Sequence, residues 1–435
     1  MTRATFDFAF AITHTAAGGL REIWNDVASG LEARGHRVAK VGLYRTCDPA
    51  GAPEGDAEGW RYLVDVPLSS PFAVLRVLYR AICFLRQARP NVVVTAMPLA
   101  NVLWPLACTL ARVPTRVVIT HHSPADTHNR WLNRMDGLTG QLRCVTRVVS
   151  VSHAVGDSLA GKAARYRAKR QTIHNALPAP VEERLETLWT KRSRIFDVPA
   201  GTRDEAAGAI TDKTADDTAT ETAGGTAGGT TGEATGEAGA GMLHVVALGR
   251  LSYQKNYPLA IRALAEAGNV RLTIAGGGED EEALRALTVQ CGVSDRVAFL
   301  GHVTRDKALE VLSEADVFLQ VSHYEGHSLA LIEAARLGIP LVVSDVPVQV
   351  EAVTHPDARQ CGLIVPVDQP AVLASVLDTL DQAPALQRHW AGLARDLGLA
   401  ASNAAMIDAY EGLLGADTNR GAASLPAAPT DRQAR

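Results

Sequence analysis

Short apolar runs rich in β-branched residues alternate along this chain with longer stretches in which apolar residues recur every three or four positions. The first unit comprises residues 6–12, 22–34 and 37–44, and in its middle segment Ile23 and Val27 fall four positions apart. The short runs predict strands, and the four-residue spacing predicts a helix with one buried face. The order strand, helix, strand is typical of a parallel sheet covered by helices on both faces.

The same alternation continues to about residue 196, stops, and resumes after residue 241. In the first half it predicts further strands at 92–94, 116–120, 145–151 and 171–173. In the second half it predicts strands at 245–251, 270–275, 297–300, 317–321 and 341–344, with helices at 258–267, 281–290, 307–314 and 329–337. We therefore predict an α/β protein of two doubly wound, Rossmann-like domains that face each other across a cleft.

The interruption and the two chain ends set the predicted domain limits. We expect an N-terminal domain at 1–196, a C-terminal domain at 242–398 and a last helix at 399–416. Residues 197–241 are almost all Thr, Ala, Gly, Asp and Glu and include no aromatic residue. Because so little apolar surface cannot offset the loss of chain entropy on folding, we predict a disordered acidic insertion there. The Pro- and Ala-rich segment 417–435 is predicted to be a disordered tail.

Composition narrows the class of protein further. A chain of 435 residues, 47% of them hydrophobic, has enough apolar material for two cores. A formal net charge of −4 gives no basic excess for binding nucleic acid. The six cysteines include no Cys-x-x-Cys pair, which favours reduced thiols in a reducing compartment. No signal peptide or run of about 20 apolar residues is present, so we predict a cytoplasmic protein.

Two facing parallel sheets bind ligands beyond the carboxyl ends of their strands, so the residues that follow the predicted strands are the candidates for a site. Gly18 and Gly19 follow the first strand and lead directly into a helix, whose N-terminus can hold a diphosphate. The alternative is a tight turn without a ligand. The chain contains no Gly-x-Gly-x-x-Gly here and no Gly-Lys-Ser/Thr, which argues against a dinucleotide or P-loop site.

A histidine pair follows a later strand of the first half. His121 and His122 could hydrogen-bond a sugar hydroxyl or position an acceptor. The alternative is an ordinary loop pair whose hydrogen bonds are satisfied locally. We expect no zinc site here, because only His128 lies nearby and zinc needs three or four ligands.

In the second half, Arg250 and Lys255 follow a strand that ends in Gly249. A guanidinium and an ammonium beside a helix N-terminus can neutralise a diphosphate leaving group without a metal ion. The alternative is that both are solvated surface charges. The turn 276–278, three glycines long, is interpreted as a connector between a strand and a helix.

Two carboxylates stand before and inside a later predicted helix. Glu325 and Glu333 are separated by seven residues. A carboxylate suits the hydroxyl groups of ribose or a hexose, and the N–H groups of Gly326, His327 and Ser328 suit a phosphate. Alternatively, Glu325 caps the helix and Glu333 is solvated. A metal is not expected, because the histidines four apart in this segment have no evident third ligand.

These two glutamates, with the following segment 334–344, resemble in wording and spacing the signature of the retaining family 4 glycosyltransferases, also called glycosyltransferase group 1. The resemblance covers about residues 6–195 and 242–415, and 173–176 matches the segment before the family's interdomain crossing. It implies a GT-B fold and transfer of a hexose-type sugar from a nucleoside diphosphate sugar to an acceptor, with retention of anomeric configuration. No cofactor besides this co-substrate and no metal is implied.

The resemblance also implies roles for individual residues. The catalytic set is Arg250, Lys255, Glu325 and His121. The donor-binding set is Gly18, Gly19, Gly326, His327, Ser328, Leu329 and Glu333. By resemblance, Glu325 approaches the donor sugar, Glu333 binds the ribose hydroxyls, and Arg250 and Lys255 hold the diphosphate. His121 or His122 matches the cleft histidine, and the sequence leaves open which of them faces the cleft. A sugar-nucleotide epimerase of the same architecture and a non-catalytic sugar-nucleotide-binding protein remain alternatives.

The acceptor is not identified by the sequence, and carbohydrate, small-molecule and lipid-linked acceptors all remain open. Residues 73–86 read as a helix that carries Arg76, Arg80 and Arg86 among apolar residues. We expect this helix to pack its apolar face on the sheet and to hold its arginines in water. The alternative is peripheral contact with an anionic membrane at its inner face, because such a helix could lie on that surface.

Overall fold

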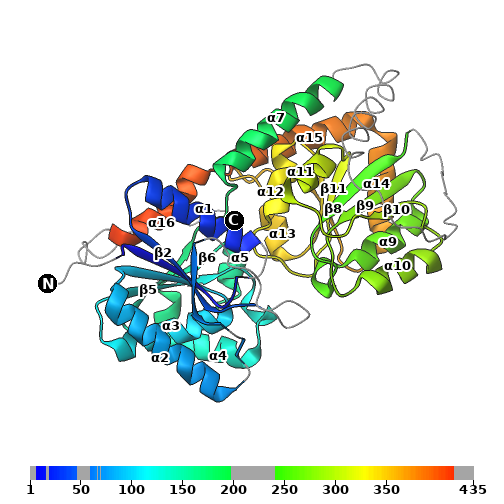
Figure 1. The fold of residues 1–435 in the computed structure, drawn as a ribbon. Coiled ribbons are helices and arrows are strands. Elements are labelled where there is room, and N and C mark those ends of the chain that lie inside the picture. Colours follow the sequence, from blue (N-terminus) through cyan, green and yellow to red (C-terminus); the bar gives the residue numbers. More distant parts are fainter. Residues whose placement is uncertain are drawn as a thin grey trace, which may run out of the picture.

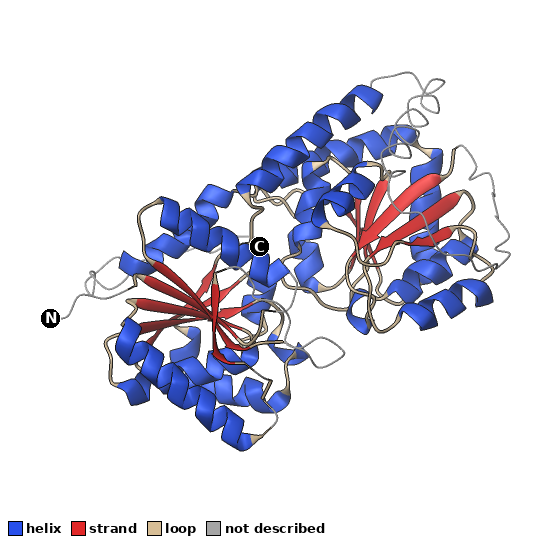
Figure 2. Cartoon of the chain, viewed as in Figure 1, coloured by secondary structure: helices blue, strands red, loops and turns tan. Residues whose placement is uncertain are grey.

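The computed structural model describes residues 6–15, 19–46, 59–65, 67–68, 70–196 and 241–415. The predicted disordered insertion, apart from Gly241, and the predicted tail lie outside the described residues. Gly18 also lies outside them, whereas Gly19 is described. Figure 1 shows two lobes, each built around a sheet, and Figure 2 shows helices on both faces of each sheet.

The N-terminal domain is built on a parallel sheet with the strand order β3-β2-β1-β4-β5-β6-β7. The strands are β1 (Phe8–Ile12), β2 (Val38–Tyr44), β3 (Trp60–Val64), β4 (Val92–Ala96), β5 (Arg116–His121), β6 (Val145–Ser150) and β7 (Arg170–Thr172). The central strand β1 pairs with β2 and β4, and Phe8 lies opposite Val38 and Val92. All five residues of β1 are buried, as expected for a strand covered on both faces.

Helices cover this sheet in two layers. One layer contains α1 (Gly19–Ala33), whose buried Trp24 packs with Phe10. The other contains α2 (Pro71–Ala88), α3 (Pro98–Ala111) and α4 (Arg130–Thr139), and α2 buries Val77 and Leu85 there. Helix α3 packs between the other two helices of this layer (Figure 1). Among the described residues, no helix is both long enough and apolar enough to cross a bilayer.

The C-terminal domain has a second parallel sheet with the strand order β10-β9-β8-β11-β12-β13. Its strands are β8 (Leu243–Leu248), β9 (Val270–Ala275), β10 (Val297–Phe299), β11 (Val317–Gln320), β12 (Leu341–Ser344) and β13 (Leu363–Val365). One face is covered by α9 (Tyr257–Glu266), α10 (Glu281–Gln290) and α14 (Pro370–Gln382). The other is covered by α7 (Ala179–Phe196), α11 (Arg305–Ser313), α12 (Leu329–Arg336) and α15 (Pro384–Ala400).

The chain changes domain before residue 196, which corrects the expected limit of the N-terminal domain. Leu185 and Leu188 of α7 are buried in the core of the C-terminal domain, and the guanidinium of Arg192 donates to the Ser313 carbonyl at 2.8 Å. No helix was predicted at 179–196, and periodicity alone does not reveal which of two sheets the apolar face of an amphipathic helix covers. The predicted insertion therefore follows a helix that already packs on the C-terminal domain.

The last helix, α16 (Asn403–Gly415), returns to the N-terminal domain. Its Tyr410 is buried against Phe10, and Ile407 belongs to the same apolar cluster as α1. At the start of α16 the Asn403 amide donates to the Leu177 carbonyl at 2.8 Å. The two interdomain crossings of the chain therefore lie side by side.

Candidate active site

Lys255 and Glu325 form an ion pair at the carboxyl ends of the C-terminal strands. The Lys255 Nζ lies 2.7 Å from Glu325 Oε1, and the Ser322 hydroxyl donates to the same oxygen at 2.8 Å. Gly249, at the end of β8, has φ of 142°, and a Cβ there would lie 2.5 Å from the Lys255 Cε. The glycine thus leaves room for the lysine side chain to reach the glutamate.

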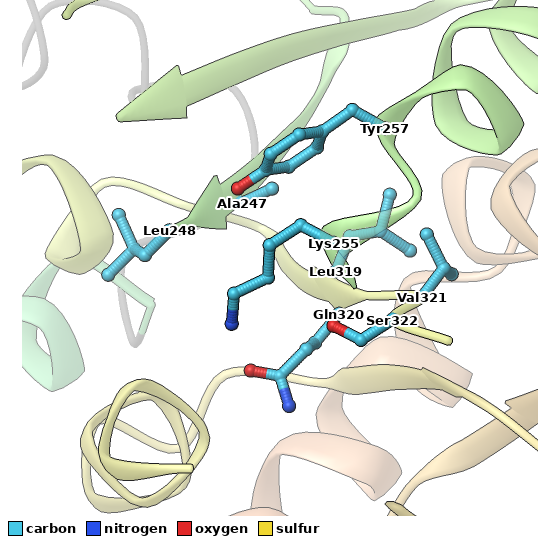
Figure 3. Close-up of a pocket in the computed structure, with 8 residues that line it drawn as sticks. All are labelled: Ala247, Leu248, Lys255, Tyr257, Leu319, Gln320, Val321 and Ser322. Atoms are coloured by element: carbon cyan, nitrogen blue, oxygen red, sulfur yellow. The ribbon is translucent and has the colours of Figure 1, made fainter. Parts of the chain in front are cut away.

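A cavity of about 10 Å³ lies beside this ion pair. Figure 3 shows Lys255 between Tyr257 and Gln320, with the ends of β8 and β11 forming the rest of the wall. The Tyr257 hydroxyl donates to the Gly249 carbonyl at 3.1 Å. A space of this size holds about one water molecule.

Arg250 is exposed at the same strand end. Within the part of the chain that the structure describes, its guanidinium has no hydrogen-bond or ion-pair partner. The glycine turn 276–278 packs against this loop, because a Cβ on Gly278 would lie 2.2 Å from the Leu251 carbonyl oxygen. The turn therefore connects β9 to α10, as its composition indicated, and also supports the backbone next to Arg250.

A buried amide network holds the segment after β11 in place. The Ser328 hydroxyl donates to Gln320 Oε1 at 2.7 Å, and the Gln320 amide donates to Gln349 at 2.7 Å. Ser328 is also the N-cap of α12, since its hydroxyl accepts the Leu331 N–H at 3.4 Å. Serine rather than Glu325 caps this helix, and Glu325 is left to pair with Lys255.

Glu333 lies on α12 and is held by an arginine that sequence reasoning missed. The Arg305 guanidinium lies 2.5 Å from Glu333 Oε1 and also forms an ion pair with Glu22 of α1. Burial raises the pKa of Glu333 to about 7, although Arg305 acts in the opposite direction. Arg305 therefore links the two domains by ion pairs to one glutamate of each. Arg305 lies two positions before the helix predicted at 307–314, and its position in the sequence did not mark it as a site residue.

The loops that carry the two glycine-containing candidate segments meet between the domains. A Cβ on Gly326 would lie only 1.9 Å from the His122 carbonyl oxygen, and a Cβ on Gly19 would lie 3.5 Å from the Leu329 side chain. The Asn175 amide of the N-terminal domain donates to the His327 carbonyl at 3.0 Å. These contacts bring the glycine loop, the histidine pair and the signature segment into one region.

The two histidines of the pair point in different directions. His121 is 2% exposed, and its Nε2 lies 2.8 Å from the Tyr166 hydroxyl, which donates to Asp136. Burial lowers the pKa of His121, with a smaller opposing effect of Asp136. His122 is partly exposed, and its ring packs edge-on to Trp24 of α1. The structure does not bring the His121 side chain to the other candidates, whereas the His122 backbone contacts Gly326.

His327 lies in the same interdomain region. Its Nδ1 is buried without a hydrogen-bond partner in the described part of the structure, and its ring centroid lies 5.2 Å from that of His174. Burial, with a smaller contribution from His174, lowers the pKa of His327 to about 4. The ring is therefore neutral near pH 7 and can act as a hydrogen-bond donor or acceptor.

Glu351 of α13 (Pro347–Ala352) makes a second contact between the domains that the sequence did not suggest. Its carboxylate accepts the N–H groups of His153 and Ala154, each at 2.7 Å, and lies 3.2 Å from His174 Nε2. Burial acts to raise the pKa of Glu351, but these hydrogen bonds outweigh it and lower the pKa to about 2. Possible ligand atoms of His153, His174 and Glu351 lie within 4.8 Å of one another. Because backbone N–H groups already occupy the carboxylate, we interpret the trio as a clamp between domains.

Two family signatures match this chain. Residues 17–179 match the family described as Glycosyltransferase Family 4, and residues 241–396 match the family described as Glycosyl transferases group 1. Each signature covers most of one domain. The chain therefore belongs to the group 1, family 4 glycosyltransferases, as the resemblance of its glutamate motif predicted, and it has their GT-B fold.

Individual proteins similar in sequence to this chain also carry the names of glycosyltransferases. An uncharacterised glycosyltransferase of Methanocaldococcus jannaschii is 38% identical over 114 residues, which are 26% of this chain and 29% of that protein. The GDP-mannose-dependent alpha-(1-6)-phosphatidylinositol monomannoside mannosyltransferase of Mycobacterium tuberculosis is 32% identical over 164 residues, 34% of this chain and 42% of that protein. The chain thus spans less than half the length of these curated relatives.

The fold has close structural counterparts. HepE from Anabaena in complex with UDP-glucose superimposes with a TM-score of 0.67 at 16% sequence identity. The superposition covers 94% of this chain and 99% of that one. At this level of identity the likeness shows the GT-B fold.

Proposed function

We propose that this protein moves a hexose-type sugar from a nucleoside diphosphate sugar to an acceptor, with retention of anomeric configuration. The observation that carries the proposal is the arrangement of charged and capping residues where the two domains meet. The Lys255–Glu325 pair, the exposed Arg250 and the cap of α12 lie at the carboxyl ends of one sheet. The glycine loop of the other domain, at Gly19, contacts Leu329 directly.

In the proposed reaction, the bond between the sugar C1 and the β-phosphate oxygen breaks with its electron pair on that oxygen. Arg250, Lys255 and the N–H groups at 326–328 stabilise the developing negative charge. The acceptor oxygen bonds to C1 from the same face, and its proton passes to the departing phosphate oxygen. Because two side-chain cations supply the positive charge, we propose that turnover needs no metal and persists in EDTA.

A donor screen tests the first half of this proposal. UDP-, GDP- and ADP-sugars are added separately, and the melting temperature is measured, since a ligand that binds the folded state raises it. The stabilising donor is then incubated with protein alone and with candidate acceptors. Product with the donor's anomeric configuration by NMR supports the proposal. An inverted product overturns retention, and isomerisation of the donor without an acceptor indicates an epimerase.

The role proposed for Glu333 makes donor affinity depend on pH. Burial raises the pKa of Glu333 to about 7 from 4.5, so the protonated carboxyl group contributes fully to folding stability below pH 4.5, and that contribution is lost as pH rises through 7. Ionised Glu333 is the stronger acceptor for ribose hydroxyls, so we expect the donor Kd to fall between pH 6 and pH 8. Titration calorimetry measures this slope. The Glu333→Gln variant should bind more weakly and lose the slope; an equal slope in the variant contradicts the assignment.

We propose that the protein works at the inner face of a membrane on a carbohydrate, lipid-linked or small-molecule acceptor. The name of the Mycobacterium tuberculosis relative includes phosphatidylinositol monomannoside, which supports a lipid among the candidate acceptors. We propose that His122 is the family's cleft histidine, because its backbone lies beside Gly326 of the signature segment. The catalytic role that the resemblance implied for His121 stays a prediction. Incubating the identified donor with water-soluble sugars and with membrane lipid extracts distinguishes the acceptor classes.

A further inference from the structure

Helix α2 exposes an ordered set of apolar side chains. Phe72, Leu75 and Tyr79 are 82%, 60% and 65% exposed. Arg76 and Arg80 are exposed between and beside them. These five residues follow the spacing i, i+3, i+4, i+7, i+8, which places them on one side of the helix. We call them the α2 stripe.

The α2 stripe is separate from the face by which α2 joins the fold. Val77, Ala81, Leu85 and Ala88 are the buried residues of the helix, and they belong to the core of the N-terminal domain or adjoin it. The sequence led us to expect an apolar face on the sheet and arginines in water. The structure confirms the buried apolar face. It also shows exposed apolar side chains beside the arginines, and packing of the helix on the core does not explain them.

The charges on α2, α3 and α4 indicate the kind of partner that the α2 stripe can bind. Helices α2 and α3 contain no acidic residue, and the acid of α4, Asp136, is buried at 2% exposure. Helix α4 adds Trp131, which is 76% exposed, next to the exposed Arg130. Figure 1 shows α2, α3 and α4 together in one layer of the N-terminal domain. Exposed aromatic and aliphatic groups among arginines, without acids, complement an anionic lipid surface.

A second copy of the chain fits this surface less well. A two-fold contact through the α2 stripe would bring Arg76 and Arg80 of both copies into one interface without an acidic residue of the stripe to offset them, and like charges close together oppose association. A bilayer that contains anionic lipids offers the opposite charge to both arginines. It also accepts the amphipathic ring of Tyr79 at the headgroup level and the apolar side chains of Phe72 and Leu75 below it.

We propose that the α2 stripe is a membrane-docking surface, with Phe72, Leu75 and Tyr79 inserted at the interface and Arg76 and Arg80 against lipid phosphates. The inference rests on the proposed transfer to an acceptor at the membrane and specifies the surface that reaches it. Helix α4 begins nine residues after His121, and the loop that precedes it includes His122, whose carbonyl oxygen lies against Gly326 of the C-terminal domain. Docking through this layer therefore brings the acceptor side of the cleft close to the bilayer.

Co-sedimentation of the full chain with lipid vesicles tests the proposal. We expect binding to vesicles that contain phosphatidylglycerol, weak binding to phosphatidylcholine alone, and release as salt rises. The Arg76→Gln/Arg80→Gln variant should lower the partition coefficient roughly thirtyfold at low salt, at about a tenfold change per 1.4 kcal/mol and about 1 kcal/mol per arginine. The Phe72→Ser/Leu75→Ser/Tyr79→Ser variant should also lose binding. Val289→Ser and Arg262→Gln, exposed changes on the C-terminal domain, serve as matched controls.

Three results would overturn the proposed docking surface. The first is that the wild type does not bind vesicles at low salt, and the second is that the stripe variants bind vesicles as well as the controls do. The third is a wild-type dimer in size-exclusion chromatography that the stripe substitutions dissociate. Donor-induced thermal shifts of the same variants separate this inference from the proposed function. Lost vesicle binding with intact donor shifts is the expected result for the stripe variants, whereas a wild type that responds to no donor counts against the proposed function alone.

Discussion

Replacing Arg250 with alanine is expected to lower turnover about 10²–10³-fold while leaving the melting temperature unchanged. The rate falls because a preorganised cation at the leaving group stabilises charge that develops only in the transition state. Stability is preserved because Arg250 is exposed and has no ion-pair partner among the described residues. Steady-state kinetics with the identified donor and a thermal melt measure the two effects.

The matched control is Arg262→Ala, which removes an exposed arginine from α9 in the same domain. It should keep wild-type turnover, since Arg262 is not at a strand end. Equal losses in both variants would indicate a general effect of charge rather than a role at the diphosphate. Wild-type turnover in the Arg250 variant would remove this residue from the site.

Replacing Gly326 with alanine is expected to lower turnover about 10²-fold while leaving both domain cores intact. The new Cβ would lie 1.9 Å from the His122 carbonyl oxygen, a contact that neither backbone can accommodate without moving. The signature segment must then shift relative to the N-terminal domain. A displacement of about 1 Å from the reacting geometry is enough to cost about 10² in rate.

Gly392→Ala on α15 is the control, because nothing lies within 4 Å of its added Cβ. Alanine inside a helix should leave turnover unchanged and raise stability slightly. Circular dichroism establishes that both variants are folded. Full turnover of the Gly326 variant would show that the contact with His122 is not needed for catalysis.

The sequence predicted the elements with strong local patterns. The buried strand Phe8–Ile12 and the amphipathic helix Gly19–Ala33 lie where the alternation placed them, within a few residues at their ends. The strands Trp60–Val64 and Leu363–Val365 were missed, because each is short and only part of each is buried. A strand of that kind has little alternation to detect and forms by pairing with its neighbour.

Candidate residues could be predicted where the residue type and its own strand end indicated a role. They could not be predicted where the role depends on contact with a distant segment. Lys255 and Glu325, 70 positions apart, were both selected from their own strand ends, and the structure pairs them. Arg305 and Glu351 were missed because their importance depends on Glu22 and Ala154 in the other domain. The different surroundings of the His121 and His122 side chains also depend on other segments, since adjacent residues at a strand end face opposite sides.

Helix α16 has a consequence for the order in which the protein can fold during its synthesis. Ile407, Tyr410 and Leu413 supply part of the apolar layer that covers β1 beside α1. These residues are translated last among the described elements, after the whole C-terminal domain. Domains commonly fold as units as they leave the ribosome, N-terminal first. Here the first sheet to emerge has one face incompletely covered until translation reaches α16, so the C-terminal domain can complete its fold before the N-terminal one.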